Sequence, residues 1–209
     1  MTVGGLDFLS VERAEAAGEF RLLARSSMEQ RQRDAEAVFA ERDGWLTAVS
    51  FPEETAHLAS VGIADLSHLG KLEIRGASQP PLDPDVVWYQ VHPERALCIF
   101  PPGRAAALQQ GLVRGGAHVI DQSAGLAILA LVGPHARALL RRLTDLDELP
   151  ASGHAARVRA DVLDRGSGVW IVFGQDYGHY LWEVAVDAAA PFGGGPIGLD
   201  VLEQEESAR

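Results

Sequence analysis

The chain has a single cysteine, Cys98, among its 209 residues. One thiol excludes an intramolecular disulfide and any metal centre built from several cysteines. Cys98 lies in the apolar run 96–100, a position typical of a small buried side chain. A chain without disulfides suits a reducing compartment, so we expect a cytoplasmic protein.

Lysine is nearly absent as well. Lys71 is the only one, and all the other fixed positive charges are arginines. The formal net charge is −11 at pH 7. Such an excess of acidic groups repels polyanions, so we expect neither nucleic acid nor an anionic membrane as a partner.

Long apolar segments and targeting signals are missing. No stretch approaches the roughly 18 apolar residues that a membrane-spanning helix needs, and the N-terminus has no basic region followed by an apolar one. Residues 1–25 are acidic, small and irregular, and we expect a flexible arm there. For the rest we predict one domain of two intertwined lobes at 26–200 and an acidic tail at 201–209.

The usual patterns of metal, nucleotide and nucleophile sites are also absent. None of the seven histidines pairs with another at the helical spacing of four, and there is no HExxH pattern, so we expect no metal site. Residues 193–195 are a glycine run that follows a predicted helix rather than a strand, which is the wrong context for a dinucleotide or phosphate loop. We expect no flavin or NAD on this chain. Without a GxSxG turn, we assign no catalytic residue.

Short strands and helices alternate along the chain and predict an α+β fold with antiparallel sheets and packed helices. Apolar patterns predict strands at 45–51, 71–75, 86–91, 96–100, 118–122, 126–132, 157–163 and 169–173. Helices are predicted at 28–41, where Ser27 and Gln30 form a capping box, and at 52–61, 101–113, 134–143 and 176–189. We expect the run 126–132 to be central and covered on both faces.

The segment 61–76 concentrates the polar groups of most interest. It reads VGIADLSHLGKLEIRG, and its second half alternates apolar and charged residues as a half-buried strand does. Before that strand, Asp65, Ser67 and His68 bring a carboxylate, a hydroxyl and an imidazole together. Neighbours on an extended chain face opposite sides, so His68 is a poor base for Ser67, while a hydrogen bond between Asp65 and Ser67 would pin the turn.

The sequence of segment 61–76 resembles the first sheet segment of the glycine-cleavage T-protein (aminomethyltransferase) family, where Asp-x-Ser-His-Met-Gly precedes a short charged strand. Three later blocks resemble the same family in the same order: residues 121–137, Tyr180 to Glu183, and Pro196 to Leu199. The resemblance covers roughly residues 26–200. It implies a T-protein/TrmE-type folate-binding fold, here lacking the family's C-terminal barrel domain.

The chain departs from the family where the family's chemistry lies. Residues 80–100 form a shortened region without an Asp-Asp pair, so the catalytic aspartate of the family is not carried over to Asp83 or Asp85. The pterin-contacting glutamate of the family has no match, and its position falls near Trp170. The shortened form most resembles the γ subunit of heterotetrameric sarcosine oxidase, which packs against larger subunits.

The resemblance implies a small T-protein-like subunit of a folate-linked sarcosine- or amine-oxidising complex, which is not catalytic by itself. Its partners would be larger flavin- and folate-binding subunits or further copies of the chain. The alternative is a stand-alone tetrahydrofolate-binding one-carbon (aminomethyl or methyl) transferase with a rearranged site. A degenerate domain with a structural or regulatory role and no ligand is a third reading.

The two functions point to different residues. If tetrahydrofolate binds, the pterin would stack on Trp170 or Tyr180, and the candidate contacts are Asp65, Ser67, His68, Leu69, Trp170 and Tyr180. For a subunit interface, the candidates are the charge-poor segment 121–134, the pair Trp88 and Tyr89, and the acidic tail.

Overall fold

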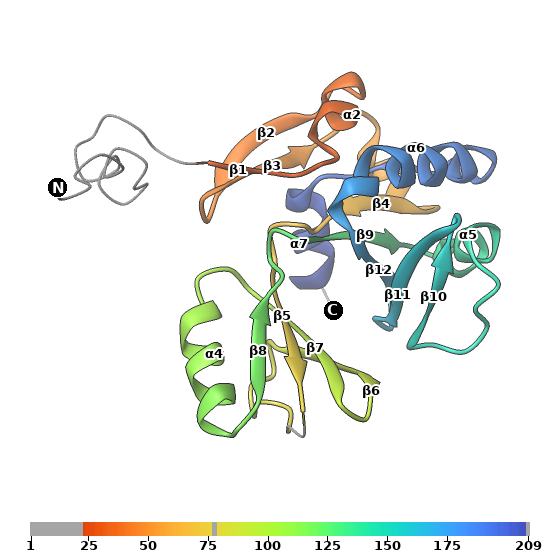
Figure 1. Ribbon diagram of the computed structural model, residues 1–209. Helices are drawn as coiled ribbons and strands as arrows, with labels where there is room; N and C mark the ends of the chain where they lie inside the picture. The colour runs from red at the N-terminus through yellow and green to blue at the C-terminus, as the bar shows by residue number, and fades with distance from the viewer. Residues whose placement is uncertain (1–22, 77–78, 208–209) are drawn as a thin grey trace, which may run out of the picture.

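The computed structural model describes residues 23–76 and 79–207. Its strands form three separate sheets, which Figure 1 shows as three lobes arranged around the helix α7 (Leu199–Ser207). Of the arm predicted at 1–25, residues 1–22 lie outside the described residues. Within its last residues, the strand β1 (Ala24–Arg25) pairs in parallel with β3 (Trp45–Ser50).

The three sheets differ in size and are mostly antiparallel. The first has the order β1-β3-β2, with β2 at Val38–Arg42. The second has the order β10-β11-β12-β9-β4-β13, formed by β10 (Ala151–Ala155), β11 (Val158–Asp164), β12 (Gly168–Gly174), β9 (Leu126–Val132), β4 (Gly62–Asp65) and β13 (Gly195–Pro196). The third has the order β6-β7-β5-β8, formed by β6 (Val87–His92), β7 (Arg95–Phe100), β5 (Gly70–Arg75) and β8 (His118–Asp121). Together with the packed helices, these sheets confirm the predicted α+β class, and none of them closes into a barrel within the described part of the chain.

Helices cover both faces of the six-stranded sheet. On one face, α5 (Ala136–Leu143) and α6 (Gly178–Ala189) bury apolar side chains against Leu129 and Leu131 of β9. On the other face, Leu199 and Leu202 of α7 pack in a core with Ile128 of β9. The prediction that this strand is central and covered on both faces is therefore confirmed, because successive side chains of a strand point to opposite sides.

The third sheet has its own smaller core beneath α4 (Ala105–Arg114). Leu72 and Ile74 of β5 face this core, as their alternation predicts, and Cys98 of β7 lies among them without solvent exposure. Burial raises the pKa of the Cys98 thiol to about 12. The thiol is therefore protonated at neutral pH and behaves as the small buried hydrophobe that the sequence indicates.

The helix predicted at 28–41 is wrong in its second half. The helix α2 (Glu29–Asp34) is followed by Glu36 with a φ of 60°, and the chain then forms β2. β2 and β3 are an antiparallel hairpin whose turn residues Asp43 and Gly44 both have positive φ. Asp-Gly is a strong hairpin signal, and here it outweighs the helical spacing of the apolar residues.

The predicted capping box is also absent. The N-cap position of α2 is Met28, and no side chain caps the helix. Ser26 instead accepts a hydrogen bond from the Met28 amide at 3.1 Å. The Ser27 hydroxyl is buried without a partner, because the start of α6 at Gly178 packs directly against it.

Several elements escape the sequence patterns, among them β4, β10 and the helix α7. The edge strand β10 has the composition ASGHA, which carries no strand signal, and it forms by pairing with β11. The tail predicted at 201–209 is helical to Ser207 as part of α7, and its last two residues lie outside the described part. A boundary at residue 200 therefore falls inside a helix, and the domain limits stay a proposal.

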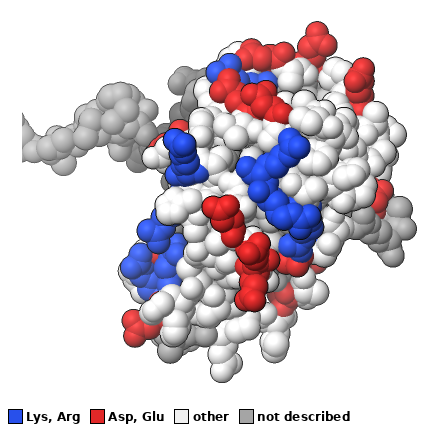
Figure 2. Space-filling view, turned by 90° about the vertical axis from the view of Figure 1, so that its right-hand side faces the viewer, with Lys and Arg blue, Asp and Glu red and all other residues white. Residues whose placement is uncertain are grey.

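The remaining helices are short: α3 (Glu54–Leu58) and the 3-10 turns η2 (Gln175–Tyr177) and η3 (Ala190–Phe192). No helix in the described residues is long and apolar enough to cross a membrane. On the surface, α5 presents exposed Arg137, Arg141 and Arg142. Figure 2, which faces the side of α5 and α6, shows a band of basic side chains flanked by acidic ones on this face.

Candidate functional site

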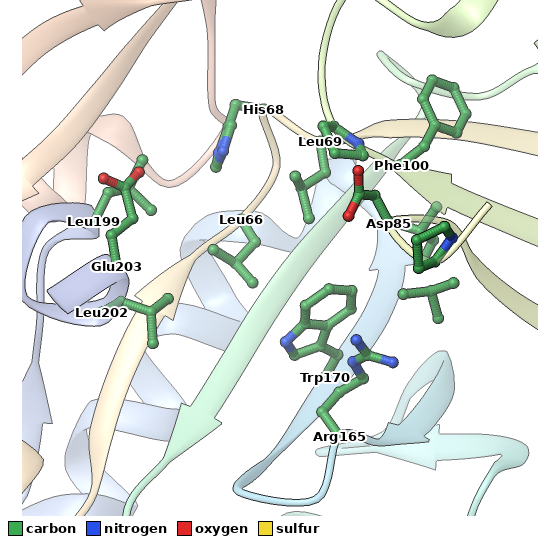
Figure 3. Close-up of a pocket in the computed structure, with 14 residues that line it drawn as sticks. Leu66, His68, Leu69, Asp85, Phe100, Arg165, Trp170, Leu199, Leu202 and Glu203 are labelled. Carbon is green, nitrogen blue, oxygen red and sulfur yellow. The ribbon is translucent and has the colours of Figure 1, made fainter. Parts of the chain in front are cut away.

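A cavity of about 380 Å³ lies where α7, the β4–β5 turn, the β6–β7 lobe and the β11–β12 hairpin meet (Figure 3). This volume falls in the range of small-molecule sites, roughly 300–1,000 Å³. Most of its wall is apolar, and four ionisable side chains reach it. The lining residues are Leu66, His68, Leu69, Pro84, Asp85, Val87, Ile99, Phe100, Pro101, Arg165, Trp170, Leu199, Leu202 and Glu203.

One glycine shapes the wall of this cavity. Gly70 begins β5 and stands opposite Phe100 in the register of the third sheet. A Cβ at position 70 would overlap the Phe100 ring, so only glycine leaves the ring its place against β5. The Phe100 ring can therefore line the cavity and also belong to the core beneath α4.

Asp65 and Ser67 build the turn that carries His68. The Asp65 carboxylate accepts hydrogen bonds from the Ser67 amide at 2.9 Å and from the Gln32 side chain at 2.8 Å. The buried Ser67 hydroxyl accepts a hydrogen bond from the Ile128 amide at 3.2 Å. The two residues are thus linked as the sequence suggests, although through the Ser67 amide rather than its hydroxyl, and neither lines the cavity.

His68 points the other way and lines the cavity. Its Nδ1 atom is buried and has no hydrogen-bond partner in the described chain. Burial lowers the pKa of the His68 imidazole, and the nearby Lys71 ammonium adds to this effect while Asp65 opposes it. The ring is therefore neutral at pH 7 and can donate from only one of its two nitrogens.

The charged groups of the cavity are unequally paired. Asp85 forms an ion pair with Arg104 at 3.2 Å, and Glu203 forms one with Arg42 at 2.8 Å. Arg165 has no ion pair within the described residues, and its guanidinium lies 4.6 Å from the centre of the Trp170 ring. Arg104 also pairs with Asp83 at 3.1 Å and Arg42 with Asp200, so these two arginines are each shared by two carboxylates. Arg165 is in contact with an aromatic face only.

The strand β5 is buried on both faces, which contradicts the prediction of a half-buried strand. Lys71 and Glu73 were expected in solvent, but Lys71 has no exposed surface and Glu73 is 7% exposed. Lys71 Nζ donates to the Ser67 carbonyl at 2.7 Å and lies 5.9 Å from the Trp45 ring centre. Sequence alternation cannot show that a second layer covers this face of the strand.

Burial affects these two charges differently. It lowers the pKa of the Lys71 ammonium to about 8, although the carboxylates of Asp65 and Asp121 raise it. Burial alone would raise the pKa of Glu73, but hydrogen bonds from Arg95 and Arg75 hold it below its usual value. Glu73 is compensated by two arginines at 3.0 and 2.7 Å, whereas Lys71 pairs with no carboxylate within the described residues.

The structure brings together part of the predicted folate contacts. His68, Leu69 and Trp170 line one cavity, with Asp65 and Ser67 behind it. Tyr180 does not reach this cavity: it lies on α6, is 43% exposed, and its hydroxyl donates to the Ala156 carbonyl at 3.0 Å. Tyr180 is therefore not placed to stack on a pterin bound in this cavity.

Sequence reasoning missed several residues of the cavity. Arg165 lies in the turn Asp-Arg-Gly-Ser-Gly, which carries no ligand-binding pattern. The residues of α7 were assigned to the connection and tail, although Leu199 and Leu202 at a spacing of three are a weak helical signal. Asp85, considered only for a catalytic role, lies at the cavity.

The predicted interface segment at 121–134 is core at 127–132, whereas its two ends are partly or fully exposed. From Ala127 to Leu131 the side chains are 1% exposed or less, because β9 is the centre of its sheet. Tyr89, expected at the surface, is 7% exposed, and its hydroxyl lies 3.1 Å from the Ser152 hydroxyl. Residues 127–132 and Tyr89 are therefore not available to a partner, while the ends of the segment stay interface candidates.

Comparison with known proteins begins with sequence. No family model matches the chain. It is 25% identical over 203 residues to the aminomethyltransferase of Bacillus subtilis (strain 168), with 75% of this chain and 56% of that protein covered. A 58-residue stretch is 45% identical to the aminomethyltransferase of Mycobacterium avium (strain 104), with 26% and 16% covered. The chain thus spans 56% or less of the length of these curated relatives.

Solved structures are similar over a larger part of the chain. The glycine cleavage system aminomethyltransferase T from Bartonella henselae matches with a TM-score of 0.68 at 17% identity, covering 85% of this chain and 60% of that one. The described chain has a T-protein-like fold. One chain of the heterotetrameric sarcosine oxidase from Corynebacterium sp. U-96 matches with a TM-score of 0.62 at 16% identity, covering 82% of this chain and 97% of that one.

The T-protein-like fold confirms the resemblance that was drawn from residues 61–76 and the later blocks. At these identities the structural matches establish the architecture alone, since one fold hosts many activities. What the T-protein-like chain does must therefore be argued from its own cavity and surfaces.

Proposed function

We propose that this chain is a small, non-catalytic subunit of a folate-linked enzyme that oxidises sarcosine or a related amine. The observation that supports this most is the extent of one structural match: 97% of a sarcosine oxidase chain is covered. In the aminomethyltransferase matches, this chain covers 60% or less of the length of the other protein. In the sarcosine oxidase, the matched unit is therefore almost a whole chain of an assembly. In this role, flavin, electron transfer and folate chemistry reside on larger subunits.

The charges of the cavity also favour a non-catalytic role. Its two carboxylates, Asp85 and Glu203, are each engaged by an arginine. The position where the resemblance places the pterin-contacting glutamate of the family falls near Trp170, whose side chain has no acidic group.

Co-production tests the subunit role. The full chain, carrying a tag, is produced together with candidate larger subunits from the same organism, and the complex is purified through the tag. We expect a flavin-containing complex that oxidises sarcosine or a related amine, and no such activity from the chain alone. The proposal fails if the larger chains form an equally active enzyme without this chain, which then elutes by itself.

We place the contact with the larger subunit on the arginine face of α5. In a chain of net charge −11, the exposed arginines of this helix are a local reversal of charge and complement an acidic surface. Arg141 has no ion pair within the described residues. Arg141→Glu should therefore weaken assembly by about tenfold, measured by biolayer interferometry.

The control for Arg141→Glu is Arg114→Glu, which makes the same charge change near the end of α4 on another lobe. We expect it to leave the affinity within about twofold of the wild type, since isolated rim charges contribute little. Equal weakening by both variants would mean that net charge, and not the α5 face, governs assembly.

The cavity favours a second candidate, a stand-alone tetrahydrofolate-binding protein. Its volume of about 380 Å³ and its Trp170 wall suit a flat ligand. A titration with folinic acid tests this, because a ligand that binds the folded state raises the melting temperature in a saturable way. A flat melting temperature across the titration would contradict tetrahydrofolate binding by this chain.

A further inference from the structure

We propose that two copies of this chain pair through the edge strand β10, so that their six-stranded sheets join in antiparallel fashion across a two-fold axis at Gly153. β10 is the last strand of its sheet, and Figure 1 shows it at the outer side of its lobe with no strand beyond it. The proposal depends neither on the cavity nor on the subunit role, and its partner is a second copy of the chain.

The turn between β10 and β11 decides which backbone groups bond within the sheet. The two turn residues, Ala156 and Arg157, have φ values of 47° and 69°, as in a type I′ hairpin. In such a hairpin the residues that close the turn, here Ala155 and Val158, exchange hydrogen bonds. Bonded and non-bonded pairs then alternate along an antiparallel ladder.

By this alternation, Ser152 and His154 direct their N–H and C=O groups away from β11. They stand opposite Asp161 and Arg159, the second and fourth pairs from the start of β10. Within the described residues, the backbone groups of Ser152 and His154 form no hydrogen bond with any other backbone segment. The open edge of β10 therefore presents two donors and two acceptors to a further strand.

The loop 144–150 leaves this edge accessible. Its Leu146 side chain lies 3.0 Å from the point where a Cβ of Gly153 would be, so it covers a face of the strand. Side chains stand out of the sheet plane, whereas ladder hydrogen bonds lie within it. Ser152 and His154 are both exposed, as an uncovered edge requires.

The other sheet edges of the described chain carry features that discourage pairing. β1 and β13 have two residues each, β2 and β6 have shifts in their registers, and β8 ends in an acidic residue. β10 has five residues, a regular register with β11, and neither a proline nor an acidic or lysine side chain. It is therefore the edge best suited to accept a strand.

One antiparallel register between two copies of β10 uses all the outward groups. With Gly153 opposite Gly153 of the second copy, Ser152 lies opposite His154 on both sides of the axis, and each such pair exchanges two hydrogen bonds. The central glycines form a non-bonded pair, whose Cα atoms approach to about 4.5 Å. A shift that sets Ser152 opposite itself would place His154 opposite Pro150, which has no N–H to donate.

The charges beside β10 are self-complementary in this arrangement. Asp147 and Glu148 precede the start of the strand, while Arg157 and Arg159 lie at its other end, and all four side chains are exposed. None of the four has an ion pair within the described residues. Antiparallel pairing brings the acidic end of one strand beside the basic end of the other, twice across the axis. This complementarity favours a second copy over an unrelated strand.

Sedimentation velocity of the full chain tests the proposal. We expect a dimer that dissociates on dilution, and a chain that is still monomeric at about 200 µM would overturn the proposal. Hydrogen exchange then locates the contact: the Ser152 and His154 amides should exchange more slowly above the midpoint of dissociation than below it. Exchange that is independent of concentration at these two amides would also overturn it, because the dimer would then use another surface.

Two substitutions at one position separate backbone pairing from a side-chain contact. His154→Pro removes an outward N–H that β11 does not use, and proline is tolerated on an edge strand at such a position. We expect it to weaken dimerisation by at least about tenfold, since the axis repeats the loss. His154→Ala keeps the backbone and should remain within about threefold of the wild type. Equal weakening by both variants would contradict strand pairing.

A charge exchange tests the arrangement without altering β10. Arg157→Glu and Glu148→Arg should each weaken the dimer by about tenfold, because like charges then meet at two places. An equal mixture of the two variants should form a heterodimer within about threefold of the wild-type affinity, because each altered charge faces an opposite one. Absence of recovery in the mixture would overturn the proposal. A monomeric wild-type chain that still joins larger subunits would overturn it as well and leave the subunit role standing.

Discussion

Gly198→Ala is expected to lower the free energy of unfolding by about 3 kcal/mol or more. A Cβ at position 198 would overlap the Val49 carbonyl and the Ser50 amide, both backbone groups of β3 that cannot rotate away. Gly198 also donates its own amide to the Glu54 carboxylate at 3.1 Å. The variant must therefore push the start of α7 away from β3, and urea unfolding monitored by circular dichroism measures the cost.

The consequence reaches the cavity, because α7 forms one of its walls through Leu199 and Leu202. Gly111→Ala is the matched control: it lies inside α4, and a Cβ there meets nothing within 4 Å. Since alanine favours a helix interior, we expect Gly111→Ala to stabilise the protein by about 0.5–1 kcal/mol. Equal unfolding free energies for the two variants would contradict the close contact of α7 with β3.

Lys71→Met is expected to stabilise the protein at neutral pH by about 2 kcal/mol. The ammonium is fully buried with a single hydrogen bond, and burial lowers its pKa from 10.5 to about 8. A shift of this size corresponds to a cost of about 3 kcal/mol for keeping the charged form in the folded state. Methionine removes that cost but leaves the Ser67 carbonyl without its donor, which offsets about 1 kcal/mol.

The pH dependence gives the sign of this effect. Because the pKa is lower in the folded state, the unfolded chain binds more protons between about pH 8 and pH 10.5. The stability of the wild type therefore rises relative to Lys71→Met across that window, and the full cost is present below it. Urea unfolding of both proteins at pH 7 and near pH 10 measures the difference, in which all other titrating groups cancel. A variant less stable than the wild type at pH 7 would mean that Lys71 supports the fold.

Sequence reasoning predicts the elements that are determined by local patterns. The run 126–132 was identified as a central strand because a continuous apolar stretch has no polar face to leave in water. The hairpin β6–β7 and the helices α5 and α6 follow from equally local patterns. Each of these elements is decided by neighbours within one strand or one helical turn.

Other features depend on partners that are distant in the sequence. The charged face of β5 reads as solvent-exposed, and only the packing of Trp45 and the turn at Ser67 makes Lys71 buried. Residues 38–41 were assigned to the helix predicted at 28–41 because of the spacing of its apolar residues. Only the pairing of residues 38–42 with β3 makes them a strand. Pairing across the chain therefore outweighs local propensity at both places.

The candidate site divides in the same way. His68, Leu69 and Trp170 were identified through a family resemblance, and the cavity brings them together. Arg165 and Asp85 lie in turns without any ligand-binding pattern, so only the packing of the second and third sheets with α7 shows that they face the same space. Tyr180 was included because aromatic residues suit a pterin, but the register of α6 directs it to the surface.

The measurement that tests the proposed subunit role most directly is native mass spectrometry of the chain co-produced with candidate larger, flavin-containing subunits. The T-protein-like chain should appear in one assembly of fixed stoichiometry, at a mass that includes the partners and their flavin. A mass equal to this chain alone, or to copies of this chain only, while the partners form a complete enzyme without it, would contradict the proposed role.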